Sequence, residues 1–196
     1  NLTESDVMVD SPTNNFCTLN PLAKTGTITL SEGNLKAAGS SSTGIVGGSF
    51  APVHSGKWYF EHCVTDASHK VRIGWRKQSS AQVVGNFGFY WNTQYDASTA
   101  YSQADEASDT NVDGGNASVG DVIGHALDLD SGTNTLKFYK NNSLVATFTA
   151  INASDGYVPV FYDFSGSSNN VSQGTLNFGQ DSSFAGLKVA QGNQDG

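Results

Sequence analysis

The chain has 196 residues, 37% of them hydrophobic, which suits one folded domain and leaves no apolar run of the roughly 18 residues that a membrane span needs. Its formal net charge is −8, and no Lys or Arg lies between Lys77 and Lys137, so we expect neither nucleic acid nor an anionic membrane as a partner. Twenty-two glycines with frequent Asn, Ser and Thr favour many turns between short strands, which predicts an all-β protein.

Residues 1–24 lack clean apolar periodicity and contain Pro12 and Pro21. We expect an extended N-terminal arm, which could alternatively pair as an edge strand. Cys17 in this arm and Cys63 could in principle form a disulfide. Two cysteines make no disulfide framework, however, and a domain of this size does not need one, so buried free thiols are expected.

Short β-type runs separated by turn clusters follow along the chain. The predicted strands are residues 34–38, 44–50, 57–65, 71–75, 87–91, 122–128, 135–140, 144–149, 157–162 and 174–178. Their spacing predicts a two-sheet antiparallel β-sandwich, and no window of eleven or more residues has the spacing of a capped amphipathic helix. We place this domain at residues 25–184 and a C-terminal tail at residues 185–196.

Two hairpins are predicted within residues 122–149. Asp128 and Asp130 lead into a turn at residues 131–134, and Asn141-Asn142 separates the next two strands. Asp is a common turn residue, and Asn tolerates the positive φ that a tight primed turn needs. We therefore expect a three-strand meander here.

The segment 92–120 is long, polar and rich in carboxylates. Loops of this length are uncommon unless they are functional or disordered, and both interpretations stay open. Asp105, Asp109 and Asp113 could supply some ligands to a calcium ion, although the loop lacks the tight geometry that such a site requires. No other metal and no cofactor is expected, because the four histidines show no i, i+4 pairing.

Several blocks of sequence are similar, in order and spacing, to those of one known family. They are Gly56-Lys57-Trp58-Tyr59-Phe60-Glu61, Arg72-Ile73-Gly74-Trp75, Gly120-Asp121-Val122-Ile123-Gly124, Asp128-Leu129-Asp130, Phe138-Tyr139-Lys140-Asn141-Asn142, Tyr157-Val158-Pro159 and Thr175-Leu176-Asn177-Phe178-Gly179. Over roughly residues 44–180 the chain thus resembles the SPRY domain family, which implies a concanavalin-like jelly roll that serves as a recognition module. Asn142 stands where the family usually has Gly.

Each of these blocks places a large apolar side chain on one face of a strand, where burial of a ring contributes on the order of 2–3 kcal/mol. The residues predicted to form the core on this basis are Trp58, Phe60, Trp75, Phe138 and Phe178.

Residues 6–21 resemble a stretch that precedes concanavalin-like domains in phage tail and other virion proteins. This resemblance implies a viral origin and a place on the particle surface, or otherwise an extracellular one. The partners that it implies are a host-surface glycan or protein, other virion proteins, or copies of the chain itself. Neither nucleic acid nor membrane insertion is expected.

The arrangements that catalysis requires are missing. Retaining sandwich glycosidases hold two carboxylates about 5–5.5 Å apart, whereas the four Glu residues here are unpaired along the chain. There is no Gly-x-Ser-x-Gly elbow and no phosphate-binding loop. We therefore expect a non-catalytic binding or decoration domain. The alternatives are a structural subunit of a phage capsid, tail or fibre, which assembles through its arm and sheet edges, and an enzyme that hydrolyses polysaccharide.

Recognition by such a domain would use loops displayed on the rigid sandwich, here residues 66–70 and 92–120. Tyr and Trp stack on sugars or apolar patches and keep a polar edge in water. The candidate ligand-binding residues are Arg76, Trp91, Tyr95, Tyr101, Asp66 and His69. Trp91 and Tyr101 could equally cap the core.

Overall fold

The computed structural model describes residues 16–39, 44–65, 71–78, 88–93, 99–103, 110–112, 117–149, 151–163 and 172–189. Residues 88–93, 99–103, 110–112 and 172 are described by their backbone alone.

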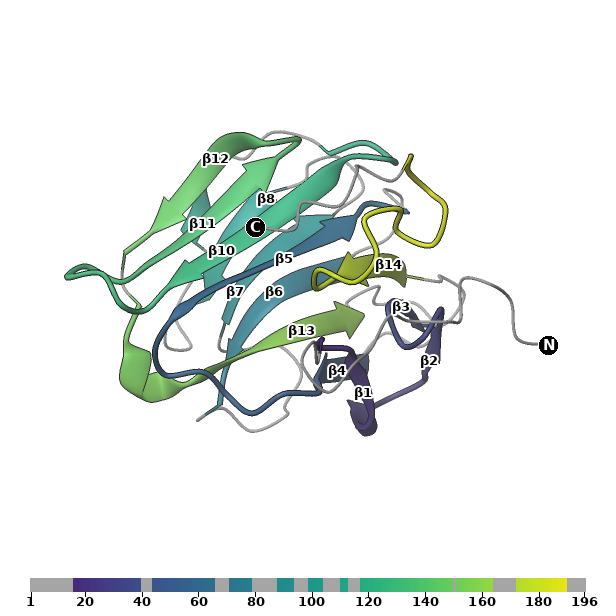
Figure 1. Ribbon diagram of the computed structural model, residues 1–196, viewed down its shortest axis with the longest axis horizontal. Helices are drawn as coiled ribbons and strands as arrows, with labels where there is room; N and C mark the ends of the chain where they lie inside the picture. The colour runs from purple at the N-terminus through teal and green to yellow at the C-terminus, as the bar shows by residue number, and fades with distance from the viewer. Residues whose placement is uncertain are drawn as a thin grey trace.

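Two antiparallel sheets of seven strands each make up the described part of the chain. The first sheet has the order β1 (Leu19–Thr25), β4 (Gly44–Gly48), β13 (Tyr157–Asp163), β6 (Val71–Lys77), β7 (Gly88–Thr93), β8 (Thr99–Gln103) and β9 (Thr110–Val112). The second has the order β12 (Ser143–Phe148), β11 (Thr135–Lys140), β10 (Val122–Asp128), β5 (Lys57–Cys63), β14 (Ser172–Asn177), β3 (Lys36–Gly39) and β2 (Ile28–Ser31). Figure 1 shows them as two layers, with β10, β11 and β12 in front of β7 and β8. The predicted all-β sandwich is confirmed.

The core lies between the sheets, where alternate residues of each strand point inward. On β5, Phe60 and His62 are buried, whereas Tyr59 is 52% exposed. The predictions for Phe60, Trp75 and Phe138 are confirmed, since each is at most 1% exposed.

Two of the residues predicted to be in the core lie nearer to solvent. Phe178 is only partly buried, although it packs against the core. The prediction for Trp58 is wrong, because its side chain is 39% exposed. Trp58 has the inward parity of Phe60, but it is the second residue of β5 and lies at the end of the sandwich, where the sheets no longer cover the whole ring.

The predicted meander is confirmed, because β10 pairs with β11 and β11 with β12. Asp128 forms the first turn as expected: its Oδ1 accepts from the backbone N–H groups of Asp130 and Ser131, each at 3.0 Å, and its Oδ2 accepts from the Ser131 hydroxyl at 2.7 Å. In the second turn Asn141 and Asn142 have φ of 47° and 66°. Asn142 thus adopts the left-handed conformation for which Gly is usual.

Strands also occur where none was predicted. Within the expected N-terminal arm, Leu19 is fully buried and begins β1, which pairs with β4 as the edge strand that was the alternative interpretation. β2 pairs with β3. The segment 92–120 is not one continuous loop, because β7 extends to Thr93 and the segment contains β8 and β9. Their residues mix Thr, Ser, Asn and Gln with few apolar side chains, so the sequence shows little alternation there.

Among the described residues, helix is limited to one 3₁₀ turn, η2 (Ala153–Asp155). No helix in this part of the chain has the length and apolar character needed to cross a membrane. Cys17 and Cys63 are buried free thiols, as predicted.

Candidate functional site

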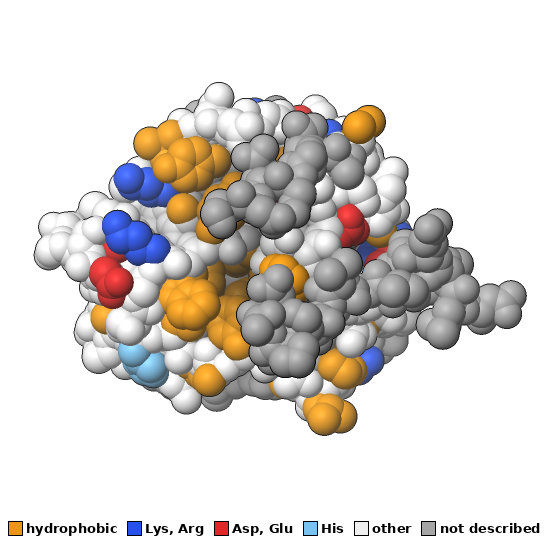
Figure 2. Space-filling model, in the orientation of Figure 1, with side chains coloured by type: hydrophobic (Ala, Val, Ile, Leu, Met, Phe, Trp, Pro, Cys, Tyr) orange, Lys and Arg blue, Asp and Glu red, His pale blue; other side chains and the backbone are white. Residues whose placement is uncertain are grey.

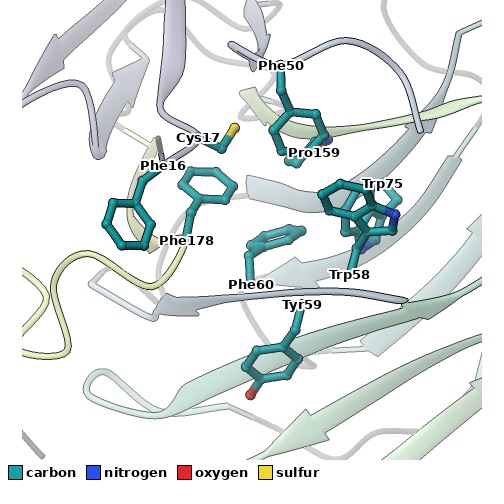
Figure 3. A pocket seen from close by; sticks show the side chains of 9 residues that line it. All are labelled: Phe16, Cys17, Phe50, Trp58, Tyr59, Phe60, Trp75, Pro159 and Phe178. Carbon is teal, nitrogen blue, oxygen red and sulfur yellow. The ribbon is translucent and has the colours of Figure 1, made fainter. Parts of the chain in front are cut away.

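A pocket of about 150 Å³ opens between the two sheets at one end of the sandwich (Figure 3). Its walls come from segments far apart in the sequence, and none of the described residues that line it is charged. The lining residues are Phe16, Cys17, Phe50, Trp58, Tyr59, Phe60, Trp75, Pro159 and Phe178. Aromatic rings therefore form most of its surface.

Trp58 forms the solvent-facing side of the pocket, and its ring is fixed by its neighbours. The indole stacks on Phe50, with ring centroids 5.5 Å apart and planes inclined by 26°. Its Nε1 donates to the carbonyl of Ser55 at 2.7 Å. Gly56 between them has a φ of +92°, and a Cβ at this position would lie 2.9 Å from that same Nε1. The conformation at Gly56 thus permits the observed orientation of Trp58.

The floor of the pocket is part of the hydrophobic core. Phe60 and Trp75 are each 1% exposed and meet edge to face, with ring centroids 5.3 Å apart. Phe178 lies 5.3 Å from Phe60 in a tilted arrangement. Aromatic pairs at such separations stabilise one another beyond the burial of their area, so this floor is well packed.

The wall at Cys17 is held by hydrogen bonds from two other parts of the chain. The side-chain amide of Gln180 donates to the Cys17 carbonyl at 2.8 Å. Ser49 bonds twice to Thr18: its backbone N–H donates to the Thr18 carbonyl at 2.7 Å, and its hydroxyl accepts from the Thr18 N–H at 3.0 Å. A Cβ at Gly48 would lie 2.9 Å from the Cys17 sulfur, so glycine lets the wall approach β4.

Cys17 and Tyr59, the titratable side chains among the described lining residues, give the pocket little reactivity. Burial raises the pKa of the Cys17 thiol, which stays protonated and weakly nucleophilic at neutral pH. Tyr59 points to the opposite side of β5 from Phe60 (Figure 3), and its hydroxyl donates to Glu61 at 2.8 Å. Burial, and then the contact with Glu61, raise the pKa of Tyr59.

Behind the floor lies a pair of buried histidines. Nδ1 of His62 and Nε2 of His125 are 2.8 Å apart, and the His125 ring stacks on Phe60 at 4.3 Å. Burial lowers the pKa of His62 to about 3. Burial, and then the proximity of His62, hold the pKa of His125 well below its usual value. Both rings are neutral at pH 7, and neither lines the pocket.

The exposed surface around the site is mixed. Figure 2 shows hydrophobic side chains in separate groups on one face, with Lys or Arg and Asp or Glu side chains beside some of them. Trp58, Tyr59 and Leu144 are the large apolar side chains that β5 and β12 expose. Beside Trp58, Lys57 forms an ion pair with Asp128 at 3.2 Å. Next to it, Asp130 accepts from the Gly56 N–H at 2.6 Å.

Of the residues predicted from the sequence to bind a ligand, Arg76 is the one whose side chain the structure describes, and it does not line this pocket. Arg76 is 9% exposed and, next to Trp75 on β6, points to the opposite face of its sheet. Trp91 pairs in register with Ile73 and Ala100. The other candidate within a described strand is Tyr101, on β8. The candidates outside the described residues are Tyr95, Asp66 and His69.

The suggested calcium ligands Asp105, Asp109 and Asp113 also lie outside the described residues. Within the part of the chain that is described, no three His, Cys, Asp or Glu side chains are grouped as metal ligands.

Sequence reasoning missed the pocket because it assigned Trp58 and Phe178 to a closed core. A signal was available in the positions of the aromatic residues. Phe50 precedes Ala51-Pro52, and Trp58 follows Ser55-Gly56 at the start of a strand. Aromatic side chains next to turn residues lie where a sandwich opens to solvent.

Comparison with known proteins adds a family and a fold. A family model described as the SPRY domain matches residues 57–181. The chain is similar to the SPRY domain of human HERC1, at 15% identity and a TM-score of 0.62, over 83% of this chain and 99% of that one. It is also similar to a second human SPRY domain, at 16% identity and a TM-score of 0.60, over 81% of this chain and 99% of that one. No curated protein matches.

Proposed function

The chain belongs to the SPRY domain family, and from this premise we propose that it is a non-catalytic module that recognises a partner macromolecule through the pocket beside Trp58. The partner in this proposal is a host-surface protein or glycan.

The observation that carries the proposal is an open pocket lined by aromatic rings, with a floor of packed core side chains. Concave apolar sites of this kind are where proteins usually bind ligands. Trp58 leaves 39% of its surface in water although it lies over a pocket, so it contributes less to folding than a buried ring would and is available for contact.

The same geometry supports the absence of catalysis. General acid–base or nucleophilic catalysis needs a titratable group at the reacting atoms. Among the described lining residues, the titratable side chains are Cys17, whose thiol stays protonated, and Tyr59, whose ring points away from the pocket. Hydrolysis of polysaccharide has no support in these residues.

We also propose that the domain lies on a virion, and this part of the proposal rests on the sequence alone. The resemblance to phage tail and other virion proteins covers residues 6–21, of which residues 6–15 lie outside the described part of the chain. A particle-surface location accords with a domain that carries a formal net charge of −8 and presents a pocket to solvent.

A screen of peptide and glycan libraries for binding tests the proposed function. The purified domain is screened against a random peptide library and a glycan array, and selected binders are measured by calorimetry. We expect binders whose affinity falls at least tenfold in Trp58→Ala, whereas Leu144→Ala, which truncates an exposed side chain on β12, binds as the wild type does. Failure to select any binder, or equal affinity for Trp58→Ala and the wild type, argues against recognition at this site.

A structural role in a capsid, tail or fibre is the second candidate, because the outermost strands β1 and β12 carry Leu22 and Leu144, which are 94% and 54% exposed. Unprotected sheet edges with apolar side chains favour association. Under this alternative, light scattering at increasing concentration shows assembly that the double variant Leu22→Glu/Leu144→Lys abolishes. A monomer at every concentration excludes assembly by the isolated chain.

A further inference from the structure

We infer that the pocket takes a single uncharged apolar side chain, between leucine and phenylalanine in size, presented by a partner protein. This inference rests on the proposed function and narrows it from a protein or glycan to a protein.

The size of the pocket sets the first limit. A volume of about 150 Å³ accommodates one ring or one branched aliphatic group, since an apolar protein cavity of about this volume is known to bind benzene. A pyranose ring is of similar size, so volume does not separate a side chain from a sugar. Polarity separates them.

The polar side-chain atoms of the lining offer a sugar few hydrogen bonds. Trp58 Nε1 already donates to Ser55, and the Cys17 thiol donates to the Thr18 carbonyl at 3.4 Å. Tyr59 points away and bonds to Glu61. Trp75 Nε1 has no hydrogen-bond partner among the described residues, but it is buried and could serve one acceptor at most. Sugar hydroxyls buried in this pocket would therefore find few side-chain partners to replace the water that they lose, which is unfavourable.

Charge sets the next limit. Among the described residues, no Asp, Glu, Lys, Arg or His lines the pocket, so a charged group would pass from water to aromatic surroundings without a counter-charge from this part of the chain. An uncharged apolar group gains from the same transfer.

The surroundings of the pocket favour a protein as the source of that group. The apolar centre lies beside the ion pair between Lys57 and Asp128 and the contact between Asp130 and the Gly56 N–H. An apolar pocket next to polar groups is the usual anatomy of a protein interface, where one anchoring side chain inserts and polar contacts surround it. A free apolar molecule would fill the pocket but would make no contact with the polar groups beside it.

Small probes test the inference directly. The domain, labelled with ¹⁵N, is titrated with N-acetyl-L-leucinamide and N-acetyl-L-phenylalaninamide, and the indole N–H resonances of Trp58 and Trp75 are followed. We expect saturable shifts at millimolar concentration. The charged N-acetyl-L-glutamate α-amide, glucose and N-acetylglucosamine should cause no saturable shift.

Phe50→Ala removes the ring on which Trp58 stacks and should weaken binding of the apolar probes by about tenfold or more. Leu144→Ala, on an edge strand, should leave it unchanged. Circular dichroism checks that both variants are folded. Equal probe affinity in Phe50→Ala and the wild type overturns the inference, and so do saturable shifts with the sugars in place of the apolar amides.

The two proposals fail in different ways. If library peptides bind at Trp58 but alanine replacement of each of their apolar residues leaves affinity unchanged, the ligand class is wrong and the recognition function stands. If the apolar probes bind at Trp58 but no peptide or glycan does, the ligand class stands and the recognition function is wrong. Glycans that bind at Trp58 while the apolar amides do not make the partner a glycan.

Discussion

Gly56 permits the observed orientation of Trp58, whose ring forms the solvent-facing side of the pocket. Its φ of +92° is one that residues with a Cβ rarely adopt, and a Cβ at this position would lie 2.9 Å from Nε1 of Trp58. The residue is small, yet the position of Trp58 depends on it.

Substitution of Gly56 tests this dependence. Gly56→Ala should lower the free energy of unfolding by about 1–2 kcal/mol, because it strains the backbone and displaces the indole. Urea unfolding measures the loss, and the Trp58 indole resonance should move. Gly132→Ala is the control, since a Cβ there meets nothing within 4 Å. Equal effects of the two variants would contradict this role of Gly56.

The histidine pair links stability to pH. His62, with a pKa lowered to about 3, and His125, also lowered, stay neutral in the fold while unfolded histidines take up protons below about pH 6.5. The unfolded state then binds more protons, so stability present above pH 6.5 is lost as the pH falls toward 3. Each histidine contributes a slope of about 1.4 kcal/mol per pH unit in this window.

Denaturant unfolding at pH 7, 6, 5 and 4 measures this slope. The double variant His62→Leu/His125→Leu should flatten it, whereas His54→Gln, which alters an exposed histidine bonded to the Ala153 carbonyl, should not. A double variant with the slope of the wild type would exclude the pair as its source.

For single residues, the sequence predicted the face of the strand on which a side chain lies better than how far the opposite sheet buries that side chain. The buried positions of Phe60, Trp75 and Phe138 follow from strand parity. The exposure of Trp58 does not, because parity says which face a side chain is on and not whether the opposite sheet reaches it. The contact between His62 and His125 depends on the pairing of β5 with β10, which strand parity does not specify.

Among the elements, β4 and the segment before β1 form a close contact. Gly48 is the last residue of β4, and Cys17 and Pro159 lie close to it. A Cβ at Gly48 would lie 2.9 Å from the sulfur of Cys17 and 3.2 Å from Cδ of Pro159. The neighbouring Gly47 has more space, since a Cβ there would lie 3.9 Å from the Pro159 carbonyl.

These two glycines give a matched test. Gly48→Ala should destabilise the protein by about 1–3 kcal/mol through overpacking and should expose the Cys17 thiol to modification. Gly47→Ala should change both quantities little. Cys17→Ala in the Gly48→Ala background should recover part of the stability, and a double-mutant cycle measures the coupling. Strictly additive effects would show that the two residues do not interact.

The strands predicted from sequence were those with strong alternation or clear turn signals. The meander of β10, β11 and β12 combines both, since Asp128 and the Asn141-Asn142 pair define its turns. β8 and β9 lack alternation, and β1 lies in a stretch with Pro21. Pairing with a neighbouring strand forms these elements, and a single sequence contains little information about that neighbour.

For the whole molecule, one core joins both sheets, because Phe60 of the second sheet contacts Trp75 of the first and both belong to one buried cluster. A shared core predicts cooperative unfolding. Tryptophan fluorescence and far-ultraviolet circular dichroism should therefore report the same urea midpoint. Two separated midpoints would show that the sheets unfold independently.

The architecture could be predicted at this scale because ordered sequence blocks, turn spacing and composition all indicated a SPRY-type sandwich. The pocket could not, since its walls meet only when residues distant in sequence are brought to one end of the sandwich.

The hydrogen bond from Gln180 to the Cys17 carbonyl closes a span of 163 residues. During synthesis the Cys17 wall therefore lacks this support until β14 has left the ribosome and paired with β5, and until Gln180, which follows β14, has also emerged. Contacts of such long range form slowly, since a large loop must close first. A growing chain thus cannot hold the complete pocket until Gln180 has left the ribosome.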